Sequence, residues 1–462
     1  MKGLFIISGL GILSMLAEIF KFKKMLYPIV LVGILAAYCF NFMEWNNNMS
    51  IRMFDNMIHF NNVSLAFSGV ILAVAFFWFI LADDYFKNET NVTDHFSLIL
   101  FSIVGALMLT AYSNMTTLFL GIEIMSIPLY VLAASRKQDP SSNEAGFKYL
   151  IMGSFATGFL LFGIALVYGA TGTFDIMIMR GKIAMTGGNM PVFFYAGVLM
   201  LLIAMCFKVS AAPFHFWAPD VYQGSPTVIT GFMSTIVKTA AFAAFLTLFL
   251  TGFRSIGETW SLTLSIVIAL SLVISNITAA SQSNVKRMLA YSSISHAAFM
   301  LMAILSNSKG MMSVNAVLYY SLAYSIGSIT AFTVLYNVSK RSGEGFEAFN
   351  GLSKRNPLMA LCMGVSMLSL AGIPVTAGFF AKYYVFTAMM GSSYKWLIIL
   401  AILTSVVGVY YYFKVIIAMY FKPADHSEPV AFEVSHVVLA VVTALLTIVL
   451  GLVPGYVIEM FS

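Results

Sequence analysis

The chain has 462 residues, of which 60% are hydrophobic and only 10% are charged. A soluble domain has about 45–50% apolar and about 25% charged residues, so this composition excludes a soluble globular enzyme, a nucleic-acid-binding protein and a disordered tail. The net charge of +6 does not indicate an acidic partner, because Lys and Arg in membrane proteins mostly determine orientation. The three cysteines, Cys39, Cys206 and Cys362, form no CxxC pair, which argues against zinc or iron–sulfur ligation.

Apolar segments long enough to cross a membrane, for which about 20 residues are needed, follow one another along the whole chain. They lie at residues 4–20, 26–43, 62–82, 96–113, 115–134, 145–170, 191–218, 225–250, 260–280, 287–305, 313–338, 356–388, 396–420 and 434–459. The polar stretches between them, the longest near 44–61 and 339–355, are too short for a soluble domain and are expected to be loops. The sequence therefore predicts an all-α polytopic membrane protein of about 14 helices that forms a single membrane domain over residues 1–462.

Lys and Arg in the connecting loops indicate the orientation of the chain. The loops after the odd-numbered helices contain thirteen of these residues, and the opposite loops together with the N-terminus contain seven. Because cytoplasmic loops carry the excess of Lys and Arg, the first set is expected on the cytoplasmic side. Both termini are then predicted to face the outer, periplasmic side of the membrane.

The remaining five cations, all lysines, lie within predicted helices. They are Lys148, Lys208, Lys238, Lys382 and Lys414. A cation at the bilayer centre costs at least about 2.5–3.5 kcal/mol, so intramembrane lysines usually have a function. Lys414 is close enough to a helix end to extend its ammonium to the cytoplasmic interface, whereas Lys208, Lys238 and Lys382 lie mid-segment. Glu123 is the one carboxylate placed deep in a predicted helix.

Two of the helices that contain a central lysine also contain helix breakers. Pro213 follows Lys208 closely, and its missing N–H and its ring disrupt the turn that starts at Val209. Gly372 and Pro374 precede Lys382 in the same way. Interrupted membrane helices at corresponding places in two halves are typical of ion pathways built from inverted repeats.

The two broken helices are the seventh and the twelfth, five helices apart. This spacing predicts two inverted five-helix repeats, formed by helices 4–8 and 9–13. The expected organisation is three N-terminal helices in residues 1–95, a first repeat in 96–250, a second repeat in 260–420 and a C-terminal helix in 434–459.

Two intramembrane histidines, His215 and His296, are further candidates for proton transfer, because histidine exchanges protons near neutral pH. Either one is alternatively a neutral packing group. A chain of protonatable groups joined by water is the chemistry that such residues support. Lysine suits this chemistry because burial disfavours the charged form of an amine, so that a moving charge can switch its protonation state.

Several segments resemble a known family. They are GIEIMSIPLYVLAA (121–134), KYLIMGSFATGFLLFGIALVYGATGT (148–173), FKVSAAPFHFWAPDVYQGSPT (207–227), NVKRMLAYSSISHAAF (284–299) and MLSLAGIPVTAGFFAKYYVF (367–386). Together they are similar to subunit N of bacterial respiratory complex I, the proton-translocating NADH–quinone oxidoreductase. The resemblance covers roughly residues 60–420, and APDVYQGSPT (218–227) is the N-type form of its segment within a superfamily that also includes Na⁺/H⁺ antiporter subunits.

This resemblance implies a set of proton-translocating residues at matching positions. They are Glu123 on helix 5, Lys148 on helix 6, Lys208 and His215 on helix 7, Lys238 on helix 8 and Lys382 on helix 12. The resemblance further implies that Glu123 pairs with Lys208, and that protons enter near Lys238 and leave towards Lys382.

The resemblance also implies the partners and the location of the chain. The expected partners are the other antiporter-like and small membrane-arm subunits of complex I, in the bacterial cytoplasmic (inner) membrane. The chain itself is expected to hold no cofactor, metal or redox centre and to bind no nucleic acid. Flavin, iron–sulfur clusters and the quinone site are expected in partner subunits, so the chain would serve the oxidoreductase as a non-redox subunit.

Three alternatives remain open from the residues alone. A subunit of a multi-subunit Na⁺/H⁺ antiporter has the same fold and differs in what drives transport. A structural scaffold has no need of costly intramembrane charges, which argues against it. A stand-alone solute transporter with a midplane binding site is the third alternative.

Overall fold

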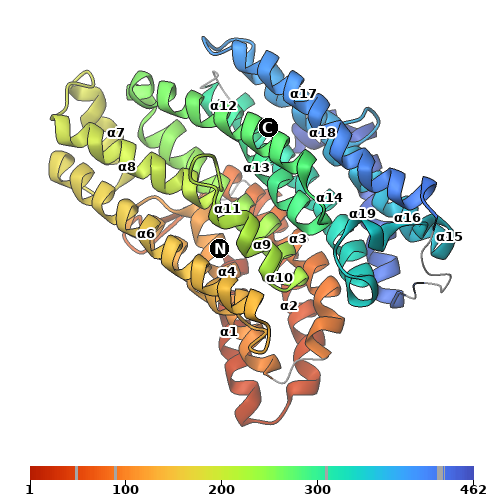
Figure 1. Cartoon of the computed structure of the whole chain (residues 1–462). Helices are drawn as coiled ribbons and strands as arrows, with labels where there is room; N and C mark the ends of the chain where they lie inside the picture. Colours follow the sequence, from red (N-terminus) through yellow and green to blue (C-terminus); the bar gives the residue numbers. More distant parts are fainter. Residues whose placement is uncertain (47–49, 88–90, 307–310, 424–429, 431, 462) are drawn as a thin grey trace. The chain divides into compact units, whose positions relative to one another are not determined.

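The computed structural model describes residues 1–46, 50–87, 91–306, 311–423, 430 and 432–461. Helices dominate this part of the chain (Figure 1), which confirms the predicted all-α polytopic fold. Within it, twelve helical segments are long and apolar enough to cross a membrane. Two shorter apolar helices, Val192–Lys208 and Pro357–Ala371, coincide with the seventh and twelfth predicted segments. Whether these two shorter helices also cross the membrane, which would give fourteen crossings, stays a prediction.

The elements follow the predicted apolar segments closely. The first are α1 (Lys2–Ile19), α2 (Lys23–Asn46), β1 (Ile51–Met53), β2 (Ile58–Phe60), α3 (Asn62–Lys87), α4 (Val92–Ala111), α5 (Met115–Ala133), α6 (Pro140–Thr171), α7 (Ile176–Met185) and α8 (Val192–Lys208). Next come α9 (Trp217–Gly224), α10 (Thr227–Phe232), the π-helix η1 (Met233–Val237), α11 (Lys238–Leu246), the π-helix η2 (Thr247–Gly252), the 3₁₀-helix η3 (Arg254–Ile256), α12 (Gly257–Ser281), α13 (Val285–Leu305) and α14 (Met312–Ser342). The last are the 3₁₀-helix η4 (Phe346–Phe349), α15 (Leu352–Arg355), α16 (Pro357–Ala371), α17 (Ala377–Met389), α18 (Trp396–Phe421), α19 (Val434–Leu452) and α20 (Pro454–Phe461).

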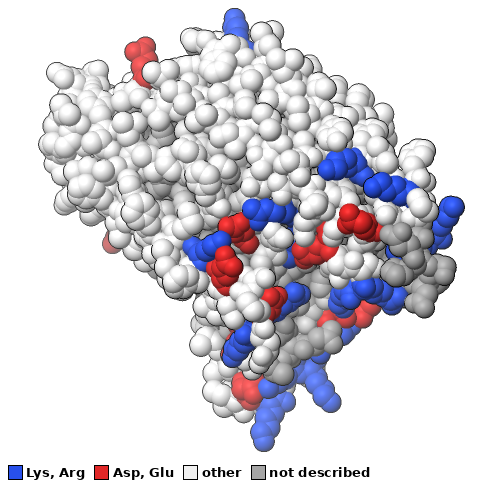
Figure 2. Space-filling model, in the orientation of Figure 1, with Lys and Arg blue, Asp and Glu red and all other residues white. Residues whose placement is uncertain are grey.

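Short polar side chains begin several of these helices by accepting hydrogen bonds from the otherwise unpaired N–H groups of the first turn. The capping residues are Asn114 on α5, Asp139 on α6, Asp175 on α7, Asn284 on α13 and Asn356 on α16. Between the caps the helices are apolar on most faces, as expected for membrane segments. Most of the surface visible in Figure 2 accordingly carries neither Lys, Arg, Asp nor Glu.

The structure corrects the predicted elements at three places. The loop expected at 44–61 contains the antiparallel hairpin β1–β2, in which Ile51 pairs with Phe60. The stretch 171–190 contains the short helix α7, which has too few residues to appear as an apolar segment. The C-terminal helix expected at 434–459 is divided into α19 and α20, because Pro454 cannot donate a backbone hydrogen bond to continue α19.

The chain folds into two compact units. The first contains residues 1–79, 83–210 and 236–264, and the second contains residues 80–82, 211–235 and 265–462. The chain leaves the first unit two residues after Lys208 and returns to it two residues before Lys238. The predicted repeats at 96–250 and 260–420, and the inverted relation between them, stay predictions.

Both predicted helix interruptions are present. α8 ends at Lys208, and Ser210 then adopts a left-handed conformation with φ of +60°. α16 ends at Ala371, where Gly372 has a φ of +85° and its N–H donates back to the carbonyl of Leu368. The second interruption therefore starts with a glycine C-cap, before Pro374 is reached.

Small residues bring the helices that carry functional candidates close together. Gly105 on α4 lies so close to α5 that a Cβ atom at this position would be 2.8 Å from the carbonyl oxygen of Gly121. Membrane helices commonly pack tightly through such small residues. As a result, α4 supports the stretch of α5 that carries Glu123 and Ser126.

Candidate functional site

Lys208 is a buried cation at a helix end. It is the last residue of α8, and only 9% of it is exposed. Its Nζ donates a hydrogen bond to Oγ of Ser126 on α5, with 3.2 Å between the two atoms. The ammonium therefore lies against α5 at the point where the backbone of α8 opens.

Glu123 lies one helical turn before Ser126 on α5 and is half-buried. Its Oε1 accepts a hydrogen bond from Oγ1 of Thr157 on α6, at 2.7 Å. The pairing of Glu123 with Lys208 that the resemblance implies stays a prediction. Among the residues that the structure describes, the Glu123 carboxylate and the Lys208 ammonium make no direct ion pair within 4.0 Å. The physical reason is that Ser126 accepts the ammonium while Thr157 holds the carboxylate, and the two charges attract each other across the gap.

Lys148 is more exposed than Lys208 and Lys238. Its Nζ forms an ion pair of 2.7 Å with Glu144, four residues earlier on α6, and its side chain is 37% exposed. The structure therefore places Lys148 at the accessible first turns of α6, and its predicted role in proton transfer stays a prediction.

Lys238 is the first residue of α11 and follows the π-helix η1 directly. Only 2% of it is exposed. α11 packs against α4, where the hydroxyl of Tyr112 donates to the carbonyl of Ala244 at 2.7 Å. Because π-helical turns inside α-helices occur frequently at functional sites, the η1–α11 junction supports the selection of Lys238.

His215 lies in the stretch between α8 and α9, within the second unit. It is buried, and its ring is 4.6 Å from that of Phe216. The buried Nδ1 atom finds no hydrogen-bond partner among the described residues. Such an atom is rare in proteins, and an ordered water is its ordinary partner.

Lys382 lies on α17, just after the second interruption, and is half-buried. Its Nζ donates a 2.7 Å hydrogen bond to the carbonyl of Ala371, the last residue of α16. The two interruptions thus share one feature: each has a lysine ammonium beside the end of the helix that stops there.

His296 is buried on α13 between two tyrosines. Its Nδ1 is 2.7 Å from the hydroxyl of Tyr320, and its Nε2 is 3.0 Å from the hydroxyl of Tyr412. A small cavity, with room for about one water molecule, is lined by His296, Tyr320, Tyr324 and Gly378 of α17. This arrangement places an exchangeable imidazole and space for a water next to the helix that carries Lys382.

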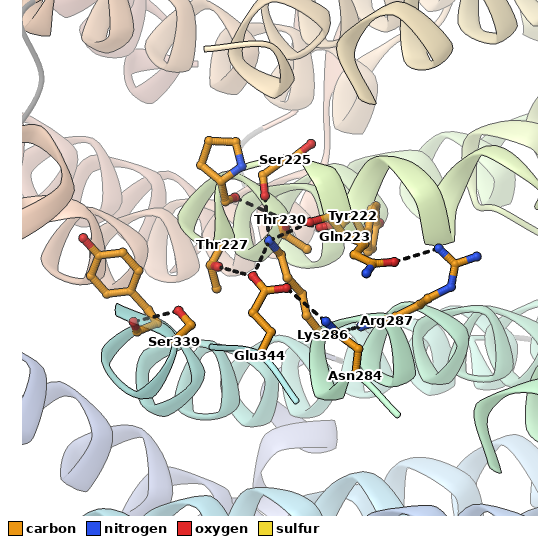
Figure 3. A network of polar contacts seen from close by, with 12 residues as sticks. Tyr222, Gln223, Ser225, Thr227, Thr230, Asn284, Lys286, Arg287, Ser339 and Glu344 are labelled. Atoms are coloured by element: carbon orange, nitrogen blue, oxygen red, sulfur yellow. Dashed lines mark hydrogen bonds and ion pairs between the residues drawn. The ribbon is translucent and has the colours of Figure 1, made fainter. Parts of the chain in front are cut away.

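Lys286 lies between the predicted segments 260–280 and 287–305, a position that predicts a loop on the cytoplasmic side, but the structure shows it as a buried cation. It lies on α13, its side chain is 1% exposed, and its Nζ forms an ion pair of 3.0 Å with Glu344 (Figure 3). The same Nζ donates to the carbonyls of Gln223 and Ser225 at the end of α9. The segments NVKR and VYQGSPT, singled out separately by the resemblance, therefore meet in one polar network. The N-cap signal of Asn284 would have placed Lys286 inside a helix.

Lys414 lies beside the end of another helix. Its Nζ donates to the carbonyls of Ala280 and Gln282 at the end of α12, at 3.2 and 3.1 Å. The ammonium therefore caps a helix, and its extension to the cytoplasmic interface stays a prediction. Lys414 has a structural role in this arrangement.

The chemistry that these groups offer is proton exchange. Among the described residues, no group of three or more His, Cys, Asp and Glu could hold a metal ion. The amines, imidazoles and phenols that are buried here are proton donors and acceptors. Their predicted role in proton transfer stays a prediction.

The chain has close relatives among known proteins. The family described as NADH:quinone oxidoreductase/Mrp antiporter, TM, matches residues 111–408. The chain is 45% identical to NADH-quinone oxidoreductase subunit N from Cytophaga hutchinsonii, over 99% of each chain. Its structure matches a chain of respiratory complex I from Thermus thermophilus with bound aureothin, with a TM-score of 0.85, 30% identity and coverage of 99% and 98%.

A chain of the Mrp complex from Dietzia sp. also has the same fold. Its TM-score is 0.89, and the match covers 99% of this chain and 95% of that one. The identity is only 16%, so this likeness concerns the fold alone. By the matched family and the full-length similarity to its relatives, the chain belongs to the NADH-quinone oxidoreductase subunit N family.

Proposed function

We propose that this chain translocates protons as a subunit of the membrane arm of an NADH–quinone oxidoreductase. Family membership supports this proposal, since a relative that is 45% identical over 99% of its length is named NADH-quinone oxidoreductase subunit N. In this role the chain couples electron transfer from NADH to quinone, which takes place in other subunits, to proton transport across the cytoplasmic membrane. Its partners are the other membrane-arm subunits.

The observation that carries the proposal is a buried lysine at an opened helix end. The Lys208 ammonium is buried, and it donates its hydrogen bond to the neutral hydroxyl of Ser126. Burial of a cation without a contacting anion is costly, so its protonation state responds to small changes in the surrounding charge. A static structural ion pair would not behave in this way.

The proposed transfer uses three lysines in sequence. Protons enter from the cytoplasm near Lys238, reach Lys208 and are passed on to Lys382. The negative charge of Glu123 favours the protonated form of Lys208. When a charge shift in a neighbouring subunit weakens this attraction, Lys208 releases its proton. Moving one charge against 100 mV costs about 2.3 kcal/mol. The interaction energy of two nearby charges at a protein surface is of the same order of magnitude.

We propose that the redox chemistry takes place in the partner subunits. Flavin, iron–sulfur clusters and the quinone site belong to partner subunits, and this chain contributes no redox centre. From the loop cations we further propose that both termini face the outer side of the membrane.

The test compares two substitutions at Lys208 by proton uptake into inverted membrane vesicles on NADH addition, normalised to assembled complex. Lys208→Met removes the charge, whereas Lys208→Arg keeps a cation that stays protonated throughout the physiological pH range. A proton-transfer role predicts that both variants lose pumping. Lys414→Met is the matched control, because it removes a lysine with a structural role, and assembled Lys414→Met complex should keep pumping. Full pumping by Lys208→Arg would refute the proposal.

A further inference from the structure

The ammonium of Lys382 is held between two groups from different helices. One is the carbonyl of Ala371, which accepts its hydrogen bond at 2.7 Å. The other is the ring of Phe299 on α13, whose centroid lies 5.1 Å from Nζ. Within the described part of the chain, no carboxylate lies within ion-pair distance of this ammonium.

Both groups favour the protonated form of the lysine. Ala371 ends α16, and the last carbonyls of a helix carry partial negative charge. The face of an aromatic ring is also negative and attracts a cation within about 6 Å. A neutral amine gains little from the ring face, so Phe299 distinguishes the two protonation states of Lys382.

The ring of Phe299 is held in a fixed orientation. Only 2% of Phe299 is exposed. Its ring stacks on that of Tyr320, with centroids 6.0 Å apart and planes inclined by 19°, and it packs against Phe386 of α17. Tyr320 also contacts Nδ1 of His296, one turn before Phe299 on α13. The cation-binding face therefore belongs to a rigid aromatic cluster beside a water-sized cavity.

We propose that Phe299 is a positioning residue for proton transfer at Lys382. The ring of Phe299 binds the ammonium of Lys382 at the end of α16 and releases it when the amine becomes neutral. This inference rests on the proposed function, because it assumes that Lys382 changes protonation state during turnover. It adds an uncharged residue to the proton-transfer machinery, and charge-based sequence reasoning does not detect such a residue.

The test replaces Phe299 in the intact complex by phenylalanines with one, two and three ring fluorines. Fluorination withdraws the negative charge from the ring face while nearly preserving its shape and its apolar surface. We expect proton uptake per assembled complex to fall stepwise along the series, in total by roughly 2- to 30-fold, the range that corresponds to a cation–π contact. The same series at Phe386, which packs on Phe299 and makes no cation–π contact in the described part of the chain, is the matched control and should leave uptake unchanged.

Natural substitutions give an independent ranking. A cation–π role predicts that Phe299→Trp and Phe299→Tyr keep more pumping than Phe299→Leu, whereas a packing role predicts the reverse for the bulky Trp. A flat fluorine series, with pumping abolished by Lys382→Met, would overturn the role of Phe299 and leave the proposed function standing. Normal pumping by assembled Lys382→Met would overturn both.

Discussion

Replacing Glu123 by Gln separates its charge from its hydrogen bond with Thr157. Gln is still able to accept from the Thr157 hydroxyl, so α5 and α6 should stay joined, while the attraction to Lys208 is lost. That attraction is on the order of 1–4 kcal/mol for near charges, so we expect proton uptake to fall by roughly tenfold or more. Thr157→Val is the control, since it keeps the charge and removes only the hydrogen bond. Uptake that drops in Thr157→Val and not in Glu123→Gln would mean that packing matters here and charge does not.

Lys286 allows a test of structural charge, because its neighbour Arg287 supplies a control. Lys286→Met leaves Glu344 and two carbonyls without their buried donor, and removal of one partner from a buried pair costs about 3–5 kcal/mol. Arg287 pairs with Asp220, and these side chains are 28% and 35% exposed. Ion pairs in contact with solvent contribute about 0–1 kcal/mol. We expect the apparent melting temperature and the yield of assembled complex to fall much further in Lys286→Met than in Arg287→Met. Equal losses would show that Lys286 stabilises the second unit no more than Arg287 does, although both belong to the network in Figure 3.

At the scale of helical elements, Gly372 determines how Lys382 meets the end of α16. A Cβ atom at Gly372 would lie 2.9 Å from Cδ and 3.0 Å from Nζ of Lys382, and the φ of +85° disfavours any residue with a side chain. Gly372→Ala should therefore displace the ammonium and lower proton uptake severalfold, in addition to a backbone cost of about 1 kcal/mol. Gly364→Ala on the same helix is the control, since a Cβ there meets nothing within 4 Å. Equal uptake by the two variants would contradict this role of Gly372.

How much of each element the sequence could predict depends on the range of the interactions that form it. Apolar length and proline chemistry are local, so the membrane segments and both interruptions were predictable. The π-helix before Lys238 has no local signature, because its sequence MSTIV is ordinary for a helix. α7 is too short to register as an apolar segment.

The geometry of the candidate site was predictable only in part, for a related reason. The residue types at Glu123, Lys208 and Lys382 follow from sequence, but their partners depend on how helices pack. Ser126 accepts the Lys208 hydrogen bond through a contact between residues 82 positions apart. Lys286 was predicted to lie in a loop because the carbonyl at the end of α9 that accepts its hydrogen bond is distant in sequence.

At the scale of the whole molecule, several lysines donate hydrogen bonds to carbonyls at the C-terminal ends of helices. Lysine ammonium groups contact the C-terminal ends of four helices: Lys182 at Thr171 of α6, Lys286 at Gln223 of α9, Lys382 at Ala371 of α16 and Lys414 at Ala280 beside the end of α12. Away from water these carbonyls need donors, and a cation also offsets the negative end of the helix dipole. Burial of a lysine alone therefore does not identify a proton-transfer residue in this protein. The controls at Lys414 and Lys286 are needed for that reason.

The last prediction concerns electron transfer by the whole complex. It follows from the proposed division, in which this chain moves protons and the partner subunits carry out the redox chemistry. If this chain only moves protons, Lys208→Ala and Lys382→Ala should leave NADH oxidation by an artificial acceptor that reacts upstream of quinone unchanged. Quinone reduction coupled to the proton gradient should fall strongly in the same membranes, because the coupled reaction cannot proceed when its protons are blocked. Measuring both activities on one preparation, normalised to the amount of assembled complex, removes differences in expression. A parallel loss of acceptor reduction in fully assembled complex would place redox chemistry within reach of these lysines and refute the division. We expect the two activities to separate, since the groups gathered around both lysines are a hydroxyl, a carbonyl and an aromatic ring, which stabilise the ammonium form of a lysine.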